Sequence, residues 1–459
     1  MQCSYAPTSL SASFDEPNLL VFAGLVPALA LGERVGLSDL ADEHLTVPGD
    51  AGANAGAKLT SIVAGMVAGA DSIADLNLLR AGASGRVFTG VRAASTCGSF
   101  LRAHRFGHVK QLDAVASRLL TGLVADQPHL VAGIERECVI DIDDTVKQVF
   151  GARKQGAEFG YTRVRGLNAQ LATISTGQSA PVIAATRLRR GAKNSAHGAT
   201  KMLQDTIRLA VRCGADPKRI LVRADSAYCT ASIVAAVTRT GARFAFAISQ
   251  NQAVQRAIAE IPAEAWTRIE YSQAIRDPDT GQMVSAAEVA EIDYTAFTSK
   301  AKQYRQTARL IVRRIPELNR DKLAAHHDTL FPLYRYHAVF SNSSKPLVEA
   351  ELDYRQHAII EQVISDLKAG PLAHLPSGVH TANGAWLACA AMAFNLTRAI
   401  AVAAGGTLTK ATTATIRARL INIPARIARS ARRLRLHLPR NWLWATSWQR
   451  AWTHAVNPA

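Results

Sequence analysis

The feature that most constrains the fold is an alternation of strand-like and helix-like segments between Cys138 and Ser249. Three β-rich apolar segments come first, and the next four alternate helix, strand, helix, strand. In order, the segments are 138–143, 170–175, 182–187, 198–213, 219–227, 230–240 and 243–249. Consecutive strands can pair antiparallel, whereas strands joined through a helix pair in parallel. The sequence therefore predicts one five-stranded mixed α/β sheet.

This order is the one expected of an RNase H-like core, and it suggests how the other regions are organised. At 459 residues the chain is too long for a single ordinary core. We expect a helical N-terminal region that binds DNA, a first part of the core, a β-rich insertion, a helix that completes the core, and a basic helical region that contacts DNA or a second subunit. In the order just given, these five regions span residues 1–135, 136–250, 251–346, 347–380 and 381–459.

The charge is strongly positive and unevenly placed. The formal net charge is +17, and no Asp or Glu follows Asp366. Eleven Lys and Arg residues lie between Arg398 and Arg450, which is more than half of the excess. A solvated surface usually mixes both signs, so this pattern favours a polyanionic partner such as nucleic acid. Arg426, Arg429, Arg432, Arg433 and Arg435 are the candidate contacts in this tail.

Carboxylates stand at the ends of two predicted strands. Asp141, Asp143 and Asp144 crowd the end of the first strand, where alternation places Asp141 and Asp143 on one face and Asp144 on the other. Asp225 ends the strand LVRAD. Ligands gather at strand ends in α/β sheets. With Glu361 these side chains form a set of hard oxygen donors, which suits Mg²⁺ or Mn²⁺, and two such ions can catalyse phosphodiester chemistry.

A third element is the segment YRQHAIIEQVISDLK, from Tyr354 to Lys368. Tyr354, His357, Glu361 and Lys368 are spaced three, four and seven residues apart, so one regular helix would place them on one stripe. The alternative is an amphipathic helix whose stripe contains an ion pair. A carboxylate flanked by a hydroxyl and basic groups also suits metal and phosphate binding.

The segment DIDDT, Asp141 to Thr145, also fits the DxDxT signature of haloacid-dehalogenase-like phosphatases, in which the first Asp is a phosphorylated nucleophile. Such enzymes also need a later acidic pair and a lysine. The sequence offers no convincing acidic pair, and the acid-free basic end has no use in a phosphatase of small molecules.

The sequence suggests the cytoplasm as the location. The N-terminus lacks a basic region followed by an apolar one, and the cysteines are scattered as in a reducing compartment. The most apolar window, Ala385 to Ala404, is interrupted by Asn395 and Arg398, which predicts a buried helix and no membrane span.

Several separate motifs resemble DDE transposases of the IS1380 group, within the IS4-like set of bacterial insertion-sequence transposases. They cover the chain from about residue 20 almost to its end. The matching segments are VIDIDDTVKQVFGARKQGAEFGY from Val139, RADSAY from Arg223, YRQHAIIEQVISDLKAG from Tyr354, AMAFNLTR from Ala391 and RLINIPARIARSARRLRLHLP from Arg419.

The resemblance implies an RNase H-like transposase that binds its element's terminal inverted repeats, cuts the ends and joins them to target DNA. It places the three catalytic acids at Asp143, Asp225 and Glu361, which would hold two Mg²⁺ ions, with Asp141 or Asp144 as alternatives for the first. Tyr354 and Lys368 would position phosphates. A homodimer on double-stranded DNA and a hairpin intermediate are implied by the family alone.

One position departs from the family's pattern of Tyr, Arg, Glu and Lys on this helix. The Arg position holds His357, and Arg355, a further candidate DNA contact, lies about 160° around the helix from it. A histidine makes phosphate contact dependent on pH. A catalytically decayed copy that keeps only DNA binding is therefore the main alternative to an active transposase.

Overall fold

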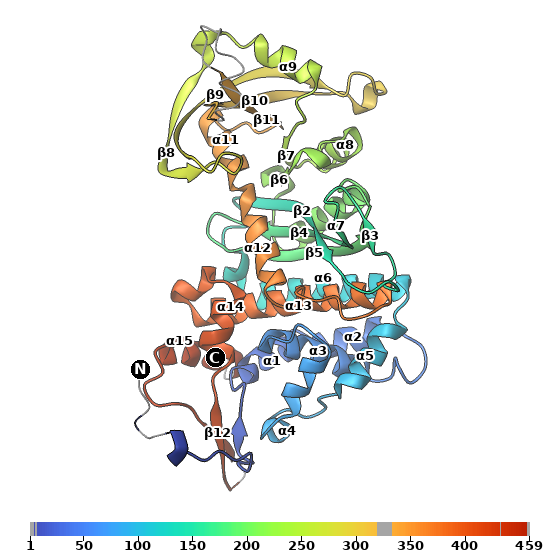
Figure 1. Ribbon diagram of the computed structural model, residues 1–459, viewed down its shortest axis with the longest axis vertical. Coiled ribbons are helices and arrows are strands. Elements are labelled where there is room, and N and C mark those ends of the chain that lie inside the picture. The colour runs from blue at the N-terminus through green and yellow to red at the C-terminus, as the bar shows by residue number, and fades with distance from the viewer. Residues whose placement is uncertain (1–3, 5–6, 319–332, 432, 457–459) are drawn as a thin grey trace.

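The computed structural model describes residue 4 and residues 7–318, 333–431 and 433–456. Figure 1 shows an elongated molecule built in layers along its long axis. A β-rich part forms one end, followed by the central sheet and then by two long helices. The N-terminal helices come next, and a small β-sheet forms the opposite end.

The central sheet contains the five predicted strands in the order β5-β4-β2-β6-β7. β2 (Cys138–Gln148), β4 (Arg165–Ser175) and β5 (Val182–Arg190) pair antiparallel. β6 (Ile220–Ala224) pairs parallel with β2, and β7 (Arg243–Ala247) pairs parallel with β6. The strand and helix order expected between residues 138 and 249 is therefore confirmed.

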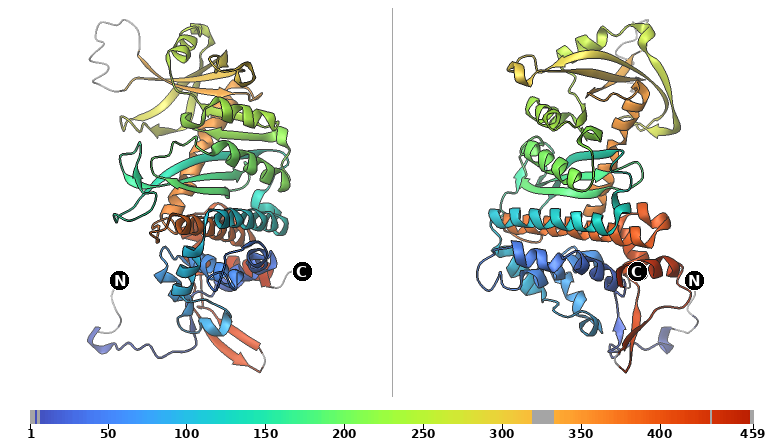
Figure 2. Two further views of the ribbon diagram at one scale, coloured as in Figure 1. Left: turned by 90° about the vertical axis from the view of Figure 1, so that its right-hand side faces the viewer. Right: turned by 180° about the vertical axis from the view of Figure 1, so that it is seen from behind.

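Helices cover both faces of this sheet. α7 (Ala199–Arg212) and α8 (Ala231–Arg239) provide the parallel crossovers on one face, and Thr230 caps α8 by accepting a hydrogen bond from the Ile233 amide. α11 (Leu347–Arg355) and α12 (Ile359–Lys368) cross the other face, as the front and rear views show (Figures 1 and 2). The strand ends consequently lie between two helical layers.

The insertion after β7 contains α9 (Gln252–Ala259) and four strands. The polar segment after Arg276 forms the turn that joins the first two of these strands into a hairpin. The strands are β8 (Thr267–Arg276), β9 (Met283–Ala296), β10 (Gln306–Pro316) and β11 (Tyr334–Ser341). β11 pairs antiparallel with β7, so the insertion continues the central sheet to ten strands including β3 (Glu158–Phe159). The expectation of a sheet that ends at five strands is wrong, because the edge of β7 is free to accept another strand.

Two long helices run beside the edge strand β5. They are α6 (Phe106–Asp126) and α13 (His380–Ala404), and on their far side pack α1 (Leu25–Arg34), α2 (Leu37–His44), α3 (Ala55–Ala68) and α5 (Ala94–Ala103). α13 is long and apolar enough to cross a membrane, but 89% of its apolar window is buried in the fold. The prediction of a buried helix there is confirmed, and α13 links the N-terminal helices to the sheet through one continuous core.

The C-terminal region differs from the helical expectation. After α14 (Thr413–Ile416) the arginine-rich segment forms a hairpin of β12 (Ala425–Ser430) and β13 (Arg433–His437), to which β1 (Leu19–Leu20) adds a third strand; α15 (Ala445–Val456) follows. The apolar residues Ile427, Leu434 and Leu436 explain the error. Their spacing has the period of two that belongs to strands, and a count of arginines does not reveal it.

Candidate active site

Two carboxylates meet where the parallel pairing of β2 with β6 ends. β2 itself continues to Gln148, so the predicted end of this strand near Asp143 is wrong. Ile142 of β2 is paired with Ala224 of β6, so the next residues along the two strands, Asp143 and Asp225, are neighbours. Asp143 accepts a hydrogen bond from the Asp144 amide at 2.7 Å, and Asp225 accepts one from the Ala227 amide at 3.0 Å. Within the described chain neither carboxylate forms an ion pair, so each keeps oxygen lone pairs for a ligand.

The surroundings disfavour the charged form of both groups. Partial burial raises the pKa of Asp143 to about 6, and the negative charges of Asp225 and Asp144 act in the same direction. Loss of water around Asp225 raises the pKa of that carboxyl as well, with Asp144 adding to the effect. A bound cation would relieve the repulsion between them.

Asp141 is placed very differently, although it lies on the same face of β2. Its side chain is fully buried, and both oxygens accept hydrogen bonds at 2.7 Å from the Arg223 guanidinium. Nδ1 of His357 also lies 2.7 Å from Oδ1 of Asp141. These contacts leave Asp141 little capacity to bind a metal ion.

Asp144 faces the other side of the sheet and is also occupied. It forms an ion pair with Arg189, whose guanidinium donates to Asn168 and to three backbone carbonyl groups of residues 194–197. Of the three aspartates in the middle of β2, the structure thus presents Asp143 as the one with no charged partner.

The segment that follows the insertion is not one regular helix. α11 ends at Arg355, a 3-10 turn spans Gln356–Ala358, and α12 begins at Ile359. The predicted single stripe is therefore wrong. The tighter turn brings residues three apart into line, and the rings of Tyr354 and His357 stack with centroids 6.2 Å apart. The same turn directs His357 onto Asp141.

The remaining side chains of the predicted stripe have unequal surroundings. Tyr354 packs against an apolar cluster, and burial raises its pKa to about 12. Glu361, in the first turn of α12, and Lys368, in its last turn, are both exposed. Arg355 donates to Glu351 at 3.0 Å and lies over the Tyr271 ring, so it is not a free cation.

The third acid is not gathered with the other two. Among the described residues, no group of three or more His, Cys, Asp or Glu side chains is arranged to hold a metal ion. The structure thus brings Asp143 and Asp225 together and leaves Glu361 on the surface of α12. Two adjacent carboxylates with raised pKa values still suit a hard divalent cation, so the donor set fits Mg²⁺ or Mn²⁺.

Sequence analysis missed the residues that hold this end of the sheet together, namely Arg223 and Arg189. Arg223 stands inside the apolar strand segment ILVRA, where an unpaired guanidinium would be costly. That position was the available signal, since a buried arginine implies a buried carboxylate partner. Arg223 also donates to the carbonyl oxygen of Asp353, which ties α11 to the same network.

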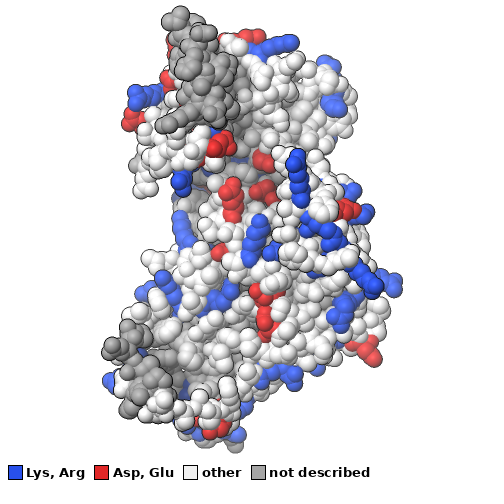
Figure 3. Space-filling view, in the orientation of Figure 1, with Lys and Arg blue, Asp and Glu red and all other residues white. Residues whose placement is uncertain are grey.

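The basic C-terminal side chains divide into two groups. Arg398 is buried and donates to two backbone carbonyl groups, and Arg419 lies over the Trp444 ring. The exposed group comprises Arg426, Arg429, Arg433 and Arg435 on the hairpin, together with Lys410, Arg440 and Arg450 outside it. Arg432 lies outside the described residues. Figure 3 shows acidic side chains near the hollow between the β-rich end and the central part, with Lys and Arg side chains on either side.

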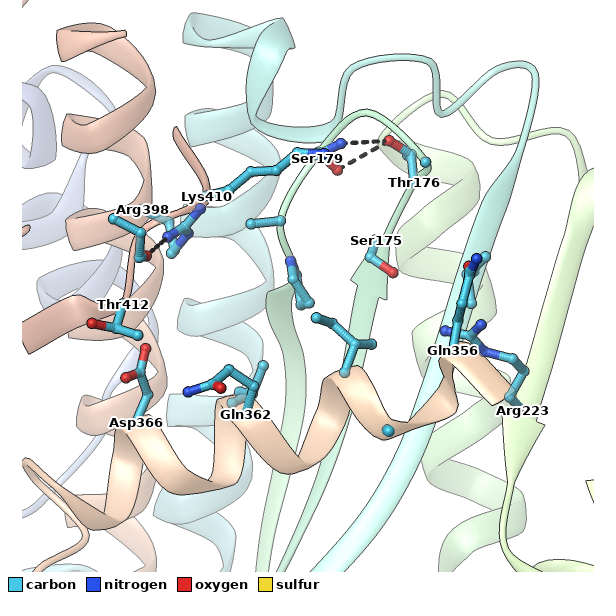
Figure 4. Close-up of a pocket in the computed structure, with 18 of the residues that line it drawn as sticks. Ser175, Thr176, Ser179, Arg223, Gln356, Gln362, Asp366, Arg398, Lys410 and Thr412 are labelled. Atoms are coloured by element: carbon cyan, nitrogen blue, oxygen red, sulfur yellow. Dashed lines mark hydrogen bonds between the residues drawn. The ribbon is translucent and has the colours of Figure 1, made fainter. Parts of the chain in front are cut away.

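A cavity of 580 Å³ lies against α12. Its lining includes Gln362 and Asp366 of α12, Arg398 of α13, and Lys410, as Figure 4 shows. None of Asp143, Asp225 and Glu361 lines it. The cavity is therefore separate from the pair of aspartates.

A family model described as "Transposase DDE domain group 1" matches residues 6–456, which is nearly the whole chain. No curated protein matches the sequence.

Proposed function

We propose that this chain, which belongs to the DDE transposase family, binds the terminal inverted repeats of an insertion sequence, cleaves the DNA at their ends and joins those ends to target DNA. The observation that carries the proposal is the Asp143–Asp225 pair, which lies where the parallel pairing of β2 with β6 ends. A whole-chain family match supports the same chemistry. We assign the protein to the cytoplasm and to the IS1380 group on the motifs described above.

The topology supports an RNase H-like core. Three antiparallel strands are followed by two parallel strands, and the order β5-β4-β2-β6-β7 places the first strand in the centre. This arrangement puts Ile142 and Asp143, in the middle of β2, beside the end of β6. It is the reason that a residue at position 143 and a residue at position 225 can share a ligand.

In this proposal Asp143, Asp225 and Glu361 hold the metal ions. When bound, two divalent ions activate a nucleophilic oxygen and stabilise the leaving oxygen of a phosphodiester. Glu361 lies one helical turn beyond His357, and Asp143 lies one strand repeat beyond Asp141. His357 contacts Asp141, so the segment that carries Glu361 is held against the strand that carries Asp143.

The neighbouring residues position these acids. Arg223 and His357 both bind Asp141, so β6, β2 and the α11–α12 segment share one buried polar network. We assign His357 to this network in addition to phosphate positioning, and we keep Tyr354 and Lys368 as phosphate-positioning residues. DNA would lie across the basic surfaces, and two subunits would hold two DNA ends.

The phosphatase interpretation has no support from this geometry. It requires the first Asp of DIDDT to attack a phosphate, yet Asp141 is buried and paired with Arg223 and His357. A decayed copy would bind DNA without cleaving it, so a cleavage experiment distinguishes it from an active transposase.

The test is cleavage of DNA that carries the repeat ends, with Mg²⁺ present. Asp143→Asn, Asp225→Asn and Glu361→Gln should each reduce cleavage to background and largely keep DNA binding, because each removes one anionic ligand and preserves shape. Glu349→Gln, a swap of an exposed acid in α11, is the matched control. Binding without cleavage by the unmodified protein would identify a decayed copy. Cleavage by Asp143→Asn would disprove the assignment of the first acid.

A further inference from the structure

The hairpin between β2 and β4 projects beyond the candidate active site. β6 ends at Ala224, opposite Ile142, but β2 and β4 stay paired as far as Gln148 and Gly166. At about 3.3 Å per residue, Gln148 lies roughly 16 Å beyond Asp143 along the strand. Residues 149–165, here named the tongue, connect the two strands, and the left view of Figure 2 shows this segment projecting from the sheet.

The tongue exposes three aromatic rings within twelve residues. Phe150 is 80% exposed, Phe159 is 67% exposed and Tyr161 is 103% exposed, which is the exposure of an isolated side chain. Large aromatic side chains contribute most to stability when they are buried. These rings therefore contribute little to the fold, and their clustering marks an interaction surface.

The charges of the tongue are almost all positive. Arg153, Lys154, Arg163 and Arg165 stand against one acid, Glu158, which forms an ion pair with Arg190 of β5. Arg165 donates to the carbonyl oxygens of residues 151 and 152, and Lys154 donates to a backbone carbonyl of residue 375. These two cations shape and anchor the tongue. Arg153 and Arg163 are exposed and have no charged partner in the part of the chain that the structure describes.

A positively charged groove continues from the base of the tongue. Gly156 approaches the His380 ring so closely that a Cβ atom there would lie 2.8 Å from it. The groove has a volume of 320 Å³, and its lining includes Arg187, Arg190, Lys193, His197 and His380. The Glu158–Arg190 ion pair joins the tongue to this groove. Tongue and groove together form one basic surface with aromatic rings at its outer end.

We propose that the tongue and groove bind an unpaired segment of DNA, with bases stacked on the rings of Phe159, Tyr161 and Phe150. Aromatic rings within a basic surface suit single-stranded nucleic acid, because every unpaired base has a free π-face and every nucleotide carries a phosphate. In a duplex these faces are hidden by neighbouring base pairs. Arg153, Arg163 and Lys193 hold the phosphates. The inference rests on the proposed function, because it assumes that DNA is the substrate.

The net positive charge favours DNA over a protein partner. A second copy of this chain has a net charge of +17, so this positively charged surface would repel it. Subunit association through the tongue is therefore an outcome that the experiment must distinguish, and we do not propose it.

The experiment measures binding without divalent metal, so that cleavage plays no part. The probe is a repeat-end duplex with a short unpaired segment that contains 2-aminopurine, compared with the same duplex fully paired. The unmodified protein should quench the 2-aminopurine fluorescence and prefer the unpaired probe. The triple variant Phe150→Ala, Phe159→Ala, Tyr161→Ala should lose the quenching and about tenfold or more of that preference, since stacking contributes about 1–3 kcal/mol per base.

Two controls separate stacking from general effects. Tyr161→Phe keeps the ring and should keep the quenching. Met283→Ala removes an exposed apolar side chain of β9 in the insertion and should change nothing. Sedimentation velocity of each variant reports subunit association.

Each outcome decides something. Quenching that is lost in the triple variant and kept in Tyr161→Phe supports the inference. Equal quenching by the unmodified protein and the triple variant overturns it, and so does a triple variant that changes association alone. If the unmodified protein cleaves repeat-end DNA but never quenches the probe, only this inference fails. If it binds neither probe, the proposed function fails as well.

Discussion

Arginines have opposite surroundings at the end of the central sheet and on the C-terminal hairpin. Arg223 and Arg189 are buried, and each is paired with an aspartate. On the hairpin, Arg433 and Arg435 are exposed, and no acid follows Asp366 in the sequence to pair with them locally. The same residue type therefore stabilises the fold in one place and is available to a polyanion in the other.

The difference follows from desolvation. A buried charge costs several kcal/mol unless a partner repays it, so Arg223 and Arg189 are each paired with an aspartate. Exposed arginines are screened by water and salt, and their contribution to stability is small. The comparison therefore predicts that substitutions at the sheet change the free energy of unfolding, whereas substitutions on the hairpin change the salt dependence of DNA binding.

The largest expected effect is that of Asp141→Asn. This substitution leaves Arg223 buried without a counter-charge and weakens the contact with His357, so the free energy of unfolding should fall by about 3–5 kcal/mol. Urea denaturation followed by circular dichroism measures it. Asp144→Asn, which removes the partner of Arg189, provides a second case on the opposite face. If Asp141→Asn and Asp144→Asn each lowered the free energy of unfolding by less than about 1 kcal/mol, the proposed difference between the sheet and the hairpin would be wrong.

A smaller effect of opposite sign is expected from Asp143→Asn, two residues along the same strand. The pKa of Asp143 is raised from 3.8 to about 6 in the folded protein. The aspartate therefore destabilises the fold progressively as the pH rises from about 4 to above 6. Without metal at pH 8, the asparagine variant should be more stable by on the order of 1–3 kcal/mol.

The pH dependence provides the control for Asp143→Asn. At pH 4 the Asp143 carboxyl is protonated in the folded protein and about half protonated in the unfolded chain, so the two proteins should differ in stability much less than at pH 8. Unfolding curves in EDTA from pH 4 to pH 8 measure the difference. Added Mg²⁺ should stabilise the unmodified protein more than the variant, because the metal binds the charged carboxylate. A difference that is constant with pH would exclude titration of Asp143 as its cause.

The smallest effect on stability is expected on the hairpin. Pairing of Ser430 with Arg433 and of Ala428 with Arg435 places both arginines on one face of the hairpin, whereas Arg429 pairs with Leu434 and lies on the other face. The double variant Arg433→Gln, Arg435→Gln should change the free energy of unfolding by less than about 0.5 kcal/mol per site. It should reduce the slope of log K against log salt by roughly 0.9 for each phosphate that the variant no longer neutralises.

Arg429→Gln is the matched control, since it removes one hairpin charge from the opposite face. Its salt slope should change less than that of either Arg433→Gln or Arg435→Gln. Fluorescence anisotropy across a salt series measures all three. Equal slopes for the unmodified protein and the double variant would mean that the hairpin does not contact DNA.

The sequence by itself determined the elements of the core and the residues available for chemistry. Period-two apolar segments and amphipathic helices are local patterns, so the order of strands and helices from Cys138 to Ser249 could be predicted. The position of Asp225 at a strand end followed from the same patterns, and pairing of β2 with β6 followed from the crossover rule, whereas β2 continues beyond the predicted end at Asp143.

Only the tertiary structure decided which carboxylates are free. Asp141, Asp143 and Asp144 are nearly equivalent in sequence, but Arg223 and Arg189 arrive from strands far along the chain and occupy two of them. Pairing of β7 with β11, the 3-10 turn before α12 and the position of Glu361 likewise depend on contacts between distant segments. Local periodicity specifies which face a side chain takes, whereas its partner, and hence its charge state, is set by the segments that pack against that face.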